Sequence, residues 1–176
     1  GNACNSARDA VLVLTNATFG GGRIMGGPCT RYIGLHHVQS FGAQMGITHS
    51  MAPNDCFSLI VTDAVFNRTL IVNVGTVSAA RTVVFRRVNV TLAGSQSTGI
   101  AISMVQQAML PSNFTFDDCH MMLSAGATGQ KVGIELGFGT RDVNKLVVDV
   151  TRSRFYGLTR AVATAGCSAH TTGFVR

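Results

Sequence analysis

The stretch FSLIVTDAVFNRT, residues 57–69, has the apolar density of a buried strand, but a polar pair interrupts it and a glycosylation acceptor ends it. The polar pair is Thr62-Asp63, and the acceptor is Asn67-Arg68-Thr69. Burying unpaired polar groups costs free energy, so a polar pair is out of place at the centre of a straight buried strand. The same pattern recurs along the chain, which indicates that the polar pair marks a regular change of direction.

Six segments share the pattern: apolar, variable, apolar, two polar residues, a small residue, a variable residue and a final apolar residue. They are LVLTNATF from Leu12, IGLHHVQS from Ile33, LIVTDAVF from Leu59, VVFRRVNV from Val83, FTFDDCHM from Phe114 and VDVTRSRF from Val148. Their starts are separated by 21, 26, 24, 31 and 34 residues. Ser40 breaks the final apolar column, and Phe41 beside it predicts a one-residue bulge.

A second apolar patch follows each segment, after turns rich in Gly and Ser. The patches begin at Arg23, Met45, Leu70, Ile100, Val132 and Ala161. Short strands repeated six times with this period are typical of a β-solenoid. A leucine-rich repeat would need a helical pattern after each strand, and a β-sandwich would not explain the agreement of the columns. We therefore predict an all-β fold, one single-stranded parallel β-helix over residues 1–176, with about six coils of 21–34 residues.

In such a coil the polar pair lies at a corner facing water, and the flanking apolar columns face inward. One column should stack as a buried row formed by Leu14, Leu35, Val61, Phe85, Phe116 and Val150. The second residues of the polar pairs should stack as a solvent-facing row formed by Asn16, His37, Asp63, Arg87, Asp118 and Arg152. The last four alternate in sign, which predicts a charge ladder between adjacent strands.

Composition agrees with a strand-rich extracellular chain. Charged residues make up only 12% and Gly numbers 20, which favours strands and turns over helices. No apolar run approaches the roughly 18 residues that a membrane span needs. Four acceptor motifs of the N-x-T type predict glycosylation at outward-facing Asn16, Asn67, Asn89 and Asn113. We expect a piece of a larger extracellular domain, whose targeting and anchoring segments lie elsewhere.

The five cysteines form no CxxC pair, so neither a zinc site nor a thioredoxin-like site is predicted. Cys119 lies in the small inward column and should be a buried free thiol. Cys29 and Cys56 occupy nearly equal places in consecutive coils, which makes a disulfide between them plausible. Cys4 and Cys167 lie near opposite ends and should not pair with each other in an extended solenoid.

The irregular coils, the scattered N-x-T motifs and phrases such as FDDCHMM and VVFRRVNVTL resemble dispersed gene family protein 1 of trypanosomatids. The resemblance covers the whole chain and rests on repeat character. It implies a pectin-lyase-like β-helix ectodomain of a large surface protein with membrane spans near its C-terminus. It also implies a role in host contact at the cell surface, and it supplies no catalytic residues.

Three chemistries are weighed against this non-enzymatic, adhesin-like prediction. Asp117-Asp118, with Asp63 and Arg87 in neighbouring coils, could form the acidic centre of a polysaccharide-cleaving β-helix enzyme. A solvated corner explains them better, because every coil has such a polar pair whatever its residues. His36, His37 and His49 lack a convincing third metal ligand, so no metal site and no cofactor are predicted. A nucleic-acid role lacks aromatic residues interleaved with the basic ones.

The formal net charge is +6, and Arg supplies most of the positive charge. Arg suits bidentate contacts with sulfates and carboxylates. The predicted partners are therefore anionic glycans or host surface molecules. The candidate contacts are Arg86, Arg87, Arg152, Arg154 and Arg160. A structural spacer that holds another domain away from the membrane is the second alternative to the glycan-contact prediction.

Overall fold

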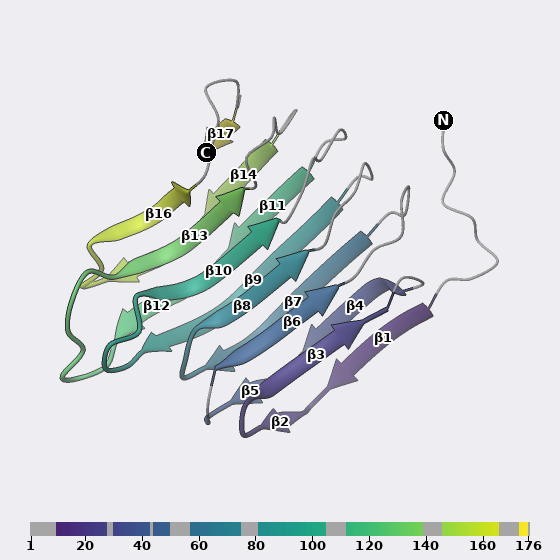
Figure 1. Ribbon diagram of the computed structural model, residues 1–176, viewed down its shortest axis with the longest axis horizontal. Helices are drawn as coiled ribbons and strands as arrows, with labels where there is room; N and C mark the ends of the chain where they lie inside the picture. Colours follow the sequence, from purple (N-terminus) through teal and green to yellow (C-terminus); the bar gives the residue numbers. More distant parts are fainter. Residues whose placement is uncertain are drawn as a thin grey trace.

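The computed structural model describes residues 10–27, 30–42, 44–49, 57–74, 81–104, 112–138, 146–165 and 173–175. Within these ranges the structure is all β, and its strands form two sheets (Figure 1). Every strand pairing between described residues is parallel. The described residues contain no helix with the length and apolar character of a membrane span.

The larger sheet has eleven strands and the smaller has six. The larger contains β1 (Ala10–Thr15), β2 (Thr18–Phe19), β4 (Thr30–His36), β5 (Gln39–Ser40), β7 (Phe57–Phe66), β9 (Arg81–Leu92), β11 (Ser112–Asp117), β12 (His120–Leu123), β14 (Leu146–Thr151), β15 (Arg154–Tyr156) and β17 (Gly173–Val175). The smaller contains β3 (Gly22–Gly26), β6 (Met45–His49), β8 (Leu70–Val74), β10 (Thr98–Met104), β13 (Val132–Phe138) and β16 (Arg160–Ala165).

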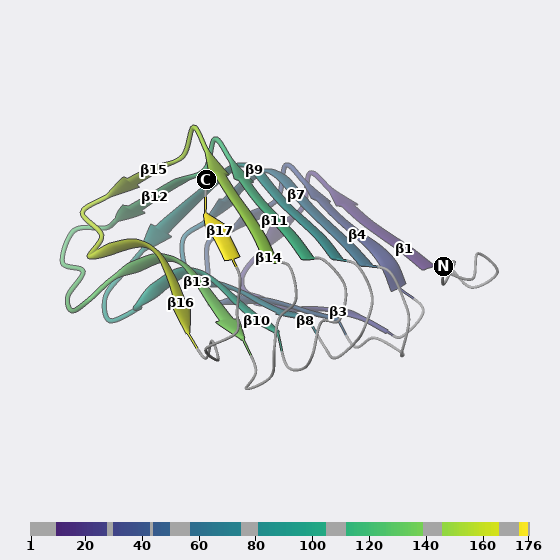
Figure 2. The same cartoon turned by 90° about the horizontal axis from the view of Figure 1, so that it is seen from above.

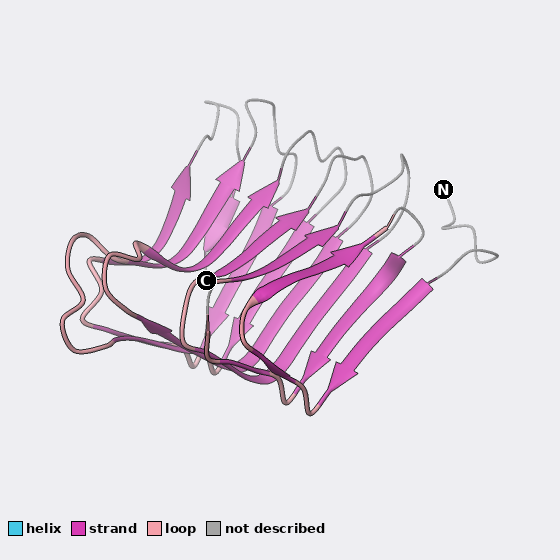
Figure 3. Cartoon of the chain, turned by 60° about the horizontal axis from the view of Figure 1, so that its bottom comes forward, coloured by secondary structure: helices cyan, strands magenta, loops and turns pink. Residues whose placement is uncertain are grey.

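The chain passes alternately through the two sheets, and each pass lies beside the previous one. The smaller sheet has the order β16-β13-β10-β8-β6-β3, and the long path of the larger sheet is β1-β4-β7-β9-β11-β14-β17. Figure 3 shows the strands side by side along the molecule, and Figure 2 shows the two sheets as facing layers. Residues with the same role in successive passes therefore become neighbours.

The observed strand register reproduces the aligned columns. Leu14 pairs with Leu35, then the row continues through Val61, Phe85, Phe116 and Val150. The four central members are fully buried, and the two end members are half-buried. The rings of Phe85 and Phe116 stack with centroids 5.1 Å apart. These side chains meet inward-facing residues of the smaller sheet, such as Ile47 and Val72, in one hydrophobic core.

The polar pairs mark a corner whose geometry the sequence did not reveal. The second residue of every pair has a left-handed backbone, with φ between 52° and 55°: Asn16, His37, Asp63, Arg87, Asp118 and Arg152. The larger sheet bends at this row. The left-handed region costs most non-glycine residues about 1–2 kcal/mol, and Asn and Asp tolerate it best. His is also enriched in this region, whereas the arginines of the row, Arg87 and Arg152, are not.

The predicted bulge at Ser40 is wrong. Ser40 pairs in register with Phe19 and Phe66, and the amide of Asn67 donates to its carbonyl, so the ladder has no extra residue. Ser40 is 3% exposed and Phe41 is 53% exposed. The serine therefore occupies the inward position itself. Its buried hydroxyl has no hydrogen-bond partner among the described residues.

Candidate functional site

The predicted glycosylation sites lie on the outside of the sheets. Asn16, Asn89 and Asn113 are exposed, and Asn67 is half-buried. An exposed asparagine in an N-x-T motif is accessible to a glycan, and glycosylation at these positions remains a prediction.

The charged row at the corner contains one of the predicted pairs. Arg87 donates from Nε to Oδ1 of Asp63 at 2.5 Å and from Nη2 to Oδ2 at 2.8 Å. These hydrogen bonds from the guanidinium hold the pKa of Asp63 below its ordinary value. The bidentate contact joins β7 to β9 across the corner.

The predicted partner of Arg152 in the charge ladder is wrong. Arg152 pairs with Asp117, through contacts of 3.0 Å and 2.6 Å, and not with Asp118. Arg86 approaches the same carboxylate to 3.4 Å. Asp118 instead lies 3.5 Å from Nε2 of His120. The left-handed corner separates the directions of the two adjacent carboxylates, so Asp117 becomes the shared acceptor between neighbouring strands.

Asp117 is only 7% exposed, because its arginine partners cover it. The hydroxyl of Thr151 also donates to its Oδ1 at 2.9 Å. Hydrogen bonds from Arg152 and Thr151 hold the pKa of Asp117 below its ordinary value. A general acid needs a raised carboxyl pKa near neutral pH, and this environment works in the opposite direction.

Three of the five candidate glycan-contact arginines are thus occupied by carboxylates. Arg86, Arg87 and Arg152 keep part of their surface in solvent but share their charge with Asp63 and Asp117. Arg154 begins β15 and Arg160 begins β16, and both are exposed. The structure does not gather the five into one patch of unpaired charge.

Cys119 is a buried free thiol, as predicted. Burial raises its pKa to about 11, and its sulfur donates to the carbonyls of Phe85 and Asp117. Such a thiol is a packing residue and not a nucleophile at neutral pH. The predicted Cys29–Cys56 pair lies outside the described residues, as do Cys4 and Cys167.

One of the three histidines considered for metal binding, His36, contacts a threonine instead. Nδ1 of His36 lies 2.8 Å from the hydroxyl of Thr62, its register neighbour on β7. Of the residues that the structure describes, no three His, Cys, Asp or Glu side chains are grouped to hold a metal ion.

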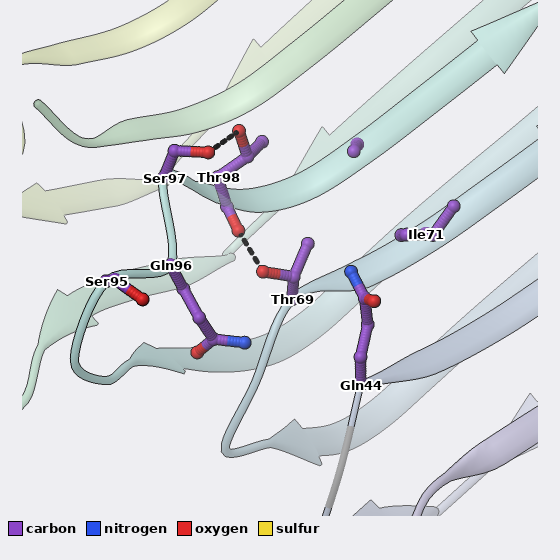
Figure 4. A pocket seen from close by; sticks show the side chains of 8 residues that line it. Gln44, Thr69, Ile71, Ser95, Gln96, Ser97 and Thr98 are labelled. Carbon is purple, nitrogen blue, oxygen red and sulfur yellow. Dashed lines mark hydrogen bonds between the residues drawn. The ribbon is translucent and has the colours of Figure 1, made fainter.

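A groove lies on the outer face of the smaller sheet, where β6, β8 and β10 begin. Its larger part is a hollow of about 350 Å³ lined by Gln44, Thr69, Ile71, Ser95, Gln96, Ser97, Thr98 and Ala101. A smaller hollow of about 100 Å³ is lined by Gly22, Arg23, Gln44, Gly46, Ile71 and Asn73. Gln44 and Ile71 border both, so the two parts adjoin. Figure 4 shows Thr69 between Gln44 and Gln96 in the larger part.

Internal hydrogen bonds fix part of the groove lining. The hydroxyl of Thr69 donates to the carbonyl of Thr98 at 2.6 Å, as drawn in Figure 4. The hydroxyl of Thr98 donates to Oε2 of Glu135 at 2.8 Å. The side-chain oxygen of Gln96 accepts from the amide of Ala93 at 3.2 Å. The first bond joins the start of β8 to that of β10, the second joins β10 to β13, and the third lies within the loop before β10.

Lys131 holds the loop before β10 through hydrogen bonds, and this contact was not predicted from the sequence. The side chain is 1% exposed. Its ammonium donates to the carbonyl of Gly94 at 2.8 Å and also to the carbonyl of Gln96. The backbone of Lys131 in turn bonds with Thr159, which ties the groove to the next pass of the chain. A lone lysine before an apolar patch gives no sequence signal of such a contact.

Comparison with known proteins adds no relative: no family model, no curated protein and no solved structure matches this chain.

Proposed function

We propose that the chain is one segment of a parallel β-helix in the extracellular part of a cell-surface protein. The alternation between two parallel sheets, pass after pass, supports the β-helix. The resemblance to dispersed gene family protein 1 and the exposed N-x-T asparagines support the surface location. In this proposal the membrane anchor belongs to segments outside residues 1–176.

We further propose that the segment contacts glycans or host surface molecules without catalysing a reaction. The observation that carries this function is the polar groove on the smaller sheet, with its fixed hydroxyl and amide groups. Binding sites need a few oriented polar groups on a rigid support, and strands supply that support. The carboxylates of Asp63 and Asp117 are held ionised by arginines, which disfavours the polysaccharide-cleaving alternative.

A glycan array with residues 1–176 tests the proposal. The chain should be made without N-linked glycans, so that its own sugars do not compete. Binding to a defined set of glycans is the expected result. Binding to none would support the spacer alternative. Release of unsaturated or shortened products from pectin, polygalacturonate or glycosaminoglycans would establish the enzyme alternative instead.

A further inference from the structure

Building on the proposed glycan contact, we propose that the groove binds an uncharged oligosaccharide that lies across the strands of the smaller sheet. The larger hollow has no charged residue in its lining. Its polar side chains are hydroxyls and primary amides, which both donate and accept hydrogen bonds. Sugar hydroxyls have the same double capacity. A sulfated or carboxylated chain would find acceptor oxygens there without a compensating cation.

The charges near the groove favour the same class of ligand. Arg23 borders only the smaller hollow. Glu135 pairs in register with Ala101 of the groove and places a carboxylate on that side. The predicted anionic-glycan arginines of the corner, Arg86, Arg87 and Arg152, belong to the larger sheet and are paired there. The ammonium of Lys131 is buried against the carbonyls of Gly94 and Gln96, so an anionic chain would meet no exposed cation in the lining of the larger hollow.

The floor of the groove sets the direction of the ligand. Gly46, Ile71 and Ala101 are register neighbours on β6, β8 and β10. Parallel strands lie about 4.8 Å apart, which is close to the length of one sugar unit in an extended chain. The small side chain of Ala101 leaves room for a ring over β10, and Ile71 on β8 offers an apolar surface for the C–H face of the ring. The side chain of Arg23 packs over Gly46 and closes the floor on β6. Successive sugar units would therefore sit over β8 and β10.

Lys131 is the positioning residue of this site. It does not line the groove, but its ammonium holds the carbonyls of Gly94 and Gln96 on either side of Ser95. Those contacts set the height of the wall that carries the amide of Gln96. Replacing the ammonium by a methyl group leaves the Gln96 carbonyl without its lysine donor, whereas the Gly94 carbonyl still accepts from the amide of Thr128 at 3.2 Å. The wall at Gln96 should therefore move while the strands remain paired.

The test compares the chain with the double variant Gln44→Ala/Gln96→Ala and with Lys131→Met. Gln39→Ala is the matched control, because it removes an exposed glutamine from β5 of the larger sheet. Arg154→Met removes one of the arginines predicted to contact anionic glycans. Titrations use neutral gluco-, manno- and galacto-oligosaccharides on one side, and heparin oligosaccharides and oligogalacturonates on the other. We expect neutral binding that weakens about tenfold in the glutamine variant, from two lost hydrogen bonds, and that also weakens in Lys131→Met. Gln39→Ala should bind neutral oligosaccharides unchanged.

The outcomes distinguish the proposed glycan function from the assignment of the groove and its ligand class. Neutral binding that is unchanged in the glutamine variant would overturn the groove assignment and leave the glycan function standing. Binding of anionic chains alone, weakened by Arg154→Met, would overturn the ligand class in the same way. Absence of all glycan binding would overturn both. If Lys131→Met fails to fold, the glutamine variant alone decides the groove assignment.

Discussion

The corner of the larger sheet and the groove of the smaller sheet are both polar surfaces over the same core, but they use different groups. At the corner, Asp63 and Asp117 are satisfied by arginines from neighbouring strands. In the groove, Gln44 and Gln96 extend from the starts of strands and the adjacent loop. Charge pairs that satisfy each other fix the register of a stack, whereas neutral groups on its surface remain available to a ligand.

The difference follows from what each surface must do. The corner repeats in every pass with a left-handed residue, so its side chains meet at strand spacing and opposite charges stabilise that contact. The groove depends on one loop, residues 93–97, and on one buried lysine. A feature built once along a repeating stack is a better candidate for recognition than a feature present in every repeat.

The largest effect is expected from the core that both surfaces share. Phe116→Ala removes a buried ring that stacks on Phe85. Large-to-small changes of this kind cost about 3–5 kcal/mol in the free energy of unfolding. Chemical denaturation should show that loss, with Val11→Ala, whose side chain is exposed, as a control near zero. A change below about 1 kcal/mol in Phe116→Ala would mean that the two surfaces do not rest on a common core.

Lys131→Met should have the next largest effect, confined to the groove. Leaving the carbonyl of Gln96 without its lysine donor costs about 1–3 kcal/mol, while the carbonyl of Gly94 keeps the amide of Thr128. Hydrogen exchange should accelerate in residues 93–97 and remain slow in β7 and β9. Equal acceleration at the corner would contradict the separation of the two surfaces.

Acid should weaken the corner and spare the groove. The pKa values of Asp63 and Asp117 lie below the ordinary aspartate value in the folded chain. The unfolded chain therefore takes up protons first, and the stability present above about pH 4 is lost as pH falls toward the folded-state values. Asp117→Asn should lower the melting temperature at neutral pH and flatten its acid dependence. Asp118→Asn is the control, and an equal response in both variants would restore the original ladder assignment.

The smallest effect is expected from Ser40, and it should be stabilising. Its buried hydroxyl lacks a partner among the described residues. Ser40→Ala removes that group without enlarging the side chain and should raise the free energy of unfolding by about 1 kcal/mol. Thermal melts would measure the gain. A loss instead would show that the hydroxyl has a partner, such as a bound water.

The rows of the stack could be predicted from the sequence because each pass repeats the same inward and outward pattern. The pairing of Phe85 with Phe116 follows from their shared column. The left-handed corner left a weaker trace in the sequence. Asn16, His37, Asp63 and Asp118 are of types that tolerate that backbone, while Arg87 and Arg152 obscure the pattern. The choice of Asp117 over Asp118 depends on side-chain directions after the bend, which no column alignment contains.

The groove could not be predicted, because it arises from contacts between different passes. Lys131 reaches back to a loop more than thirty residues earlier, at Gly94 and Gln96. Gly46 and Ala101 matter there only because the fold places them beside Ile71. None of these residues belongs to a local motif.

Chemical-shift mapping during titration with a neutral oligosaccharide tests the central claim most directly. The amide signals of Gln44, Thr69 and residues 95–98 should move in a concentration-dependent way. The amide signals of Asp63, Arg87, Asp117 and Arg152 should stay in place. Shifts concentrated at the corner, with the groove unaffected, would contradict the claim that charge there serves register and that neutral groups serve recognition.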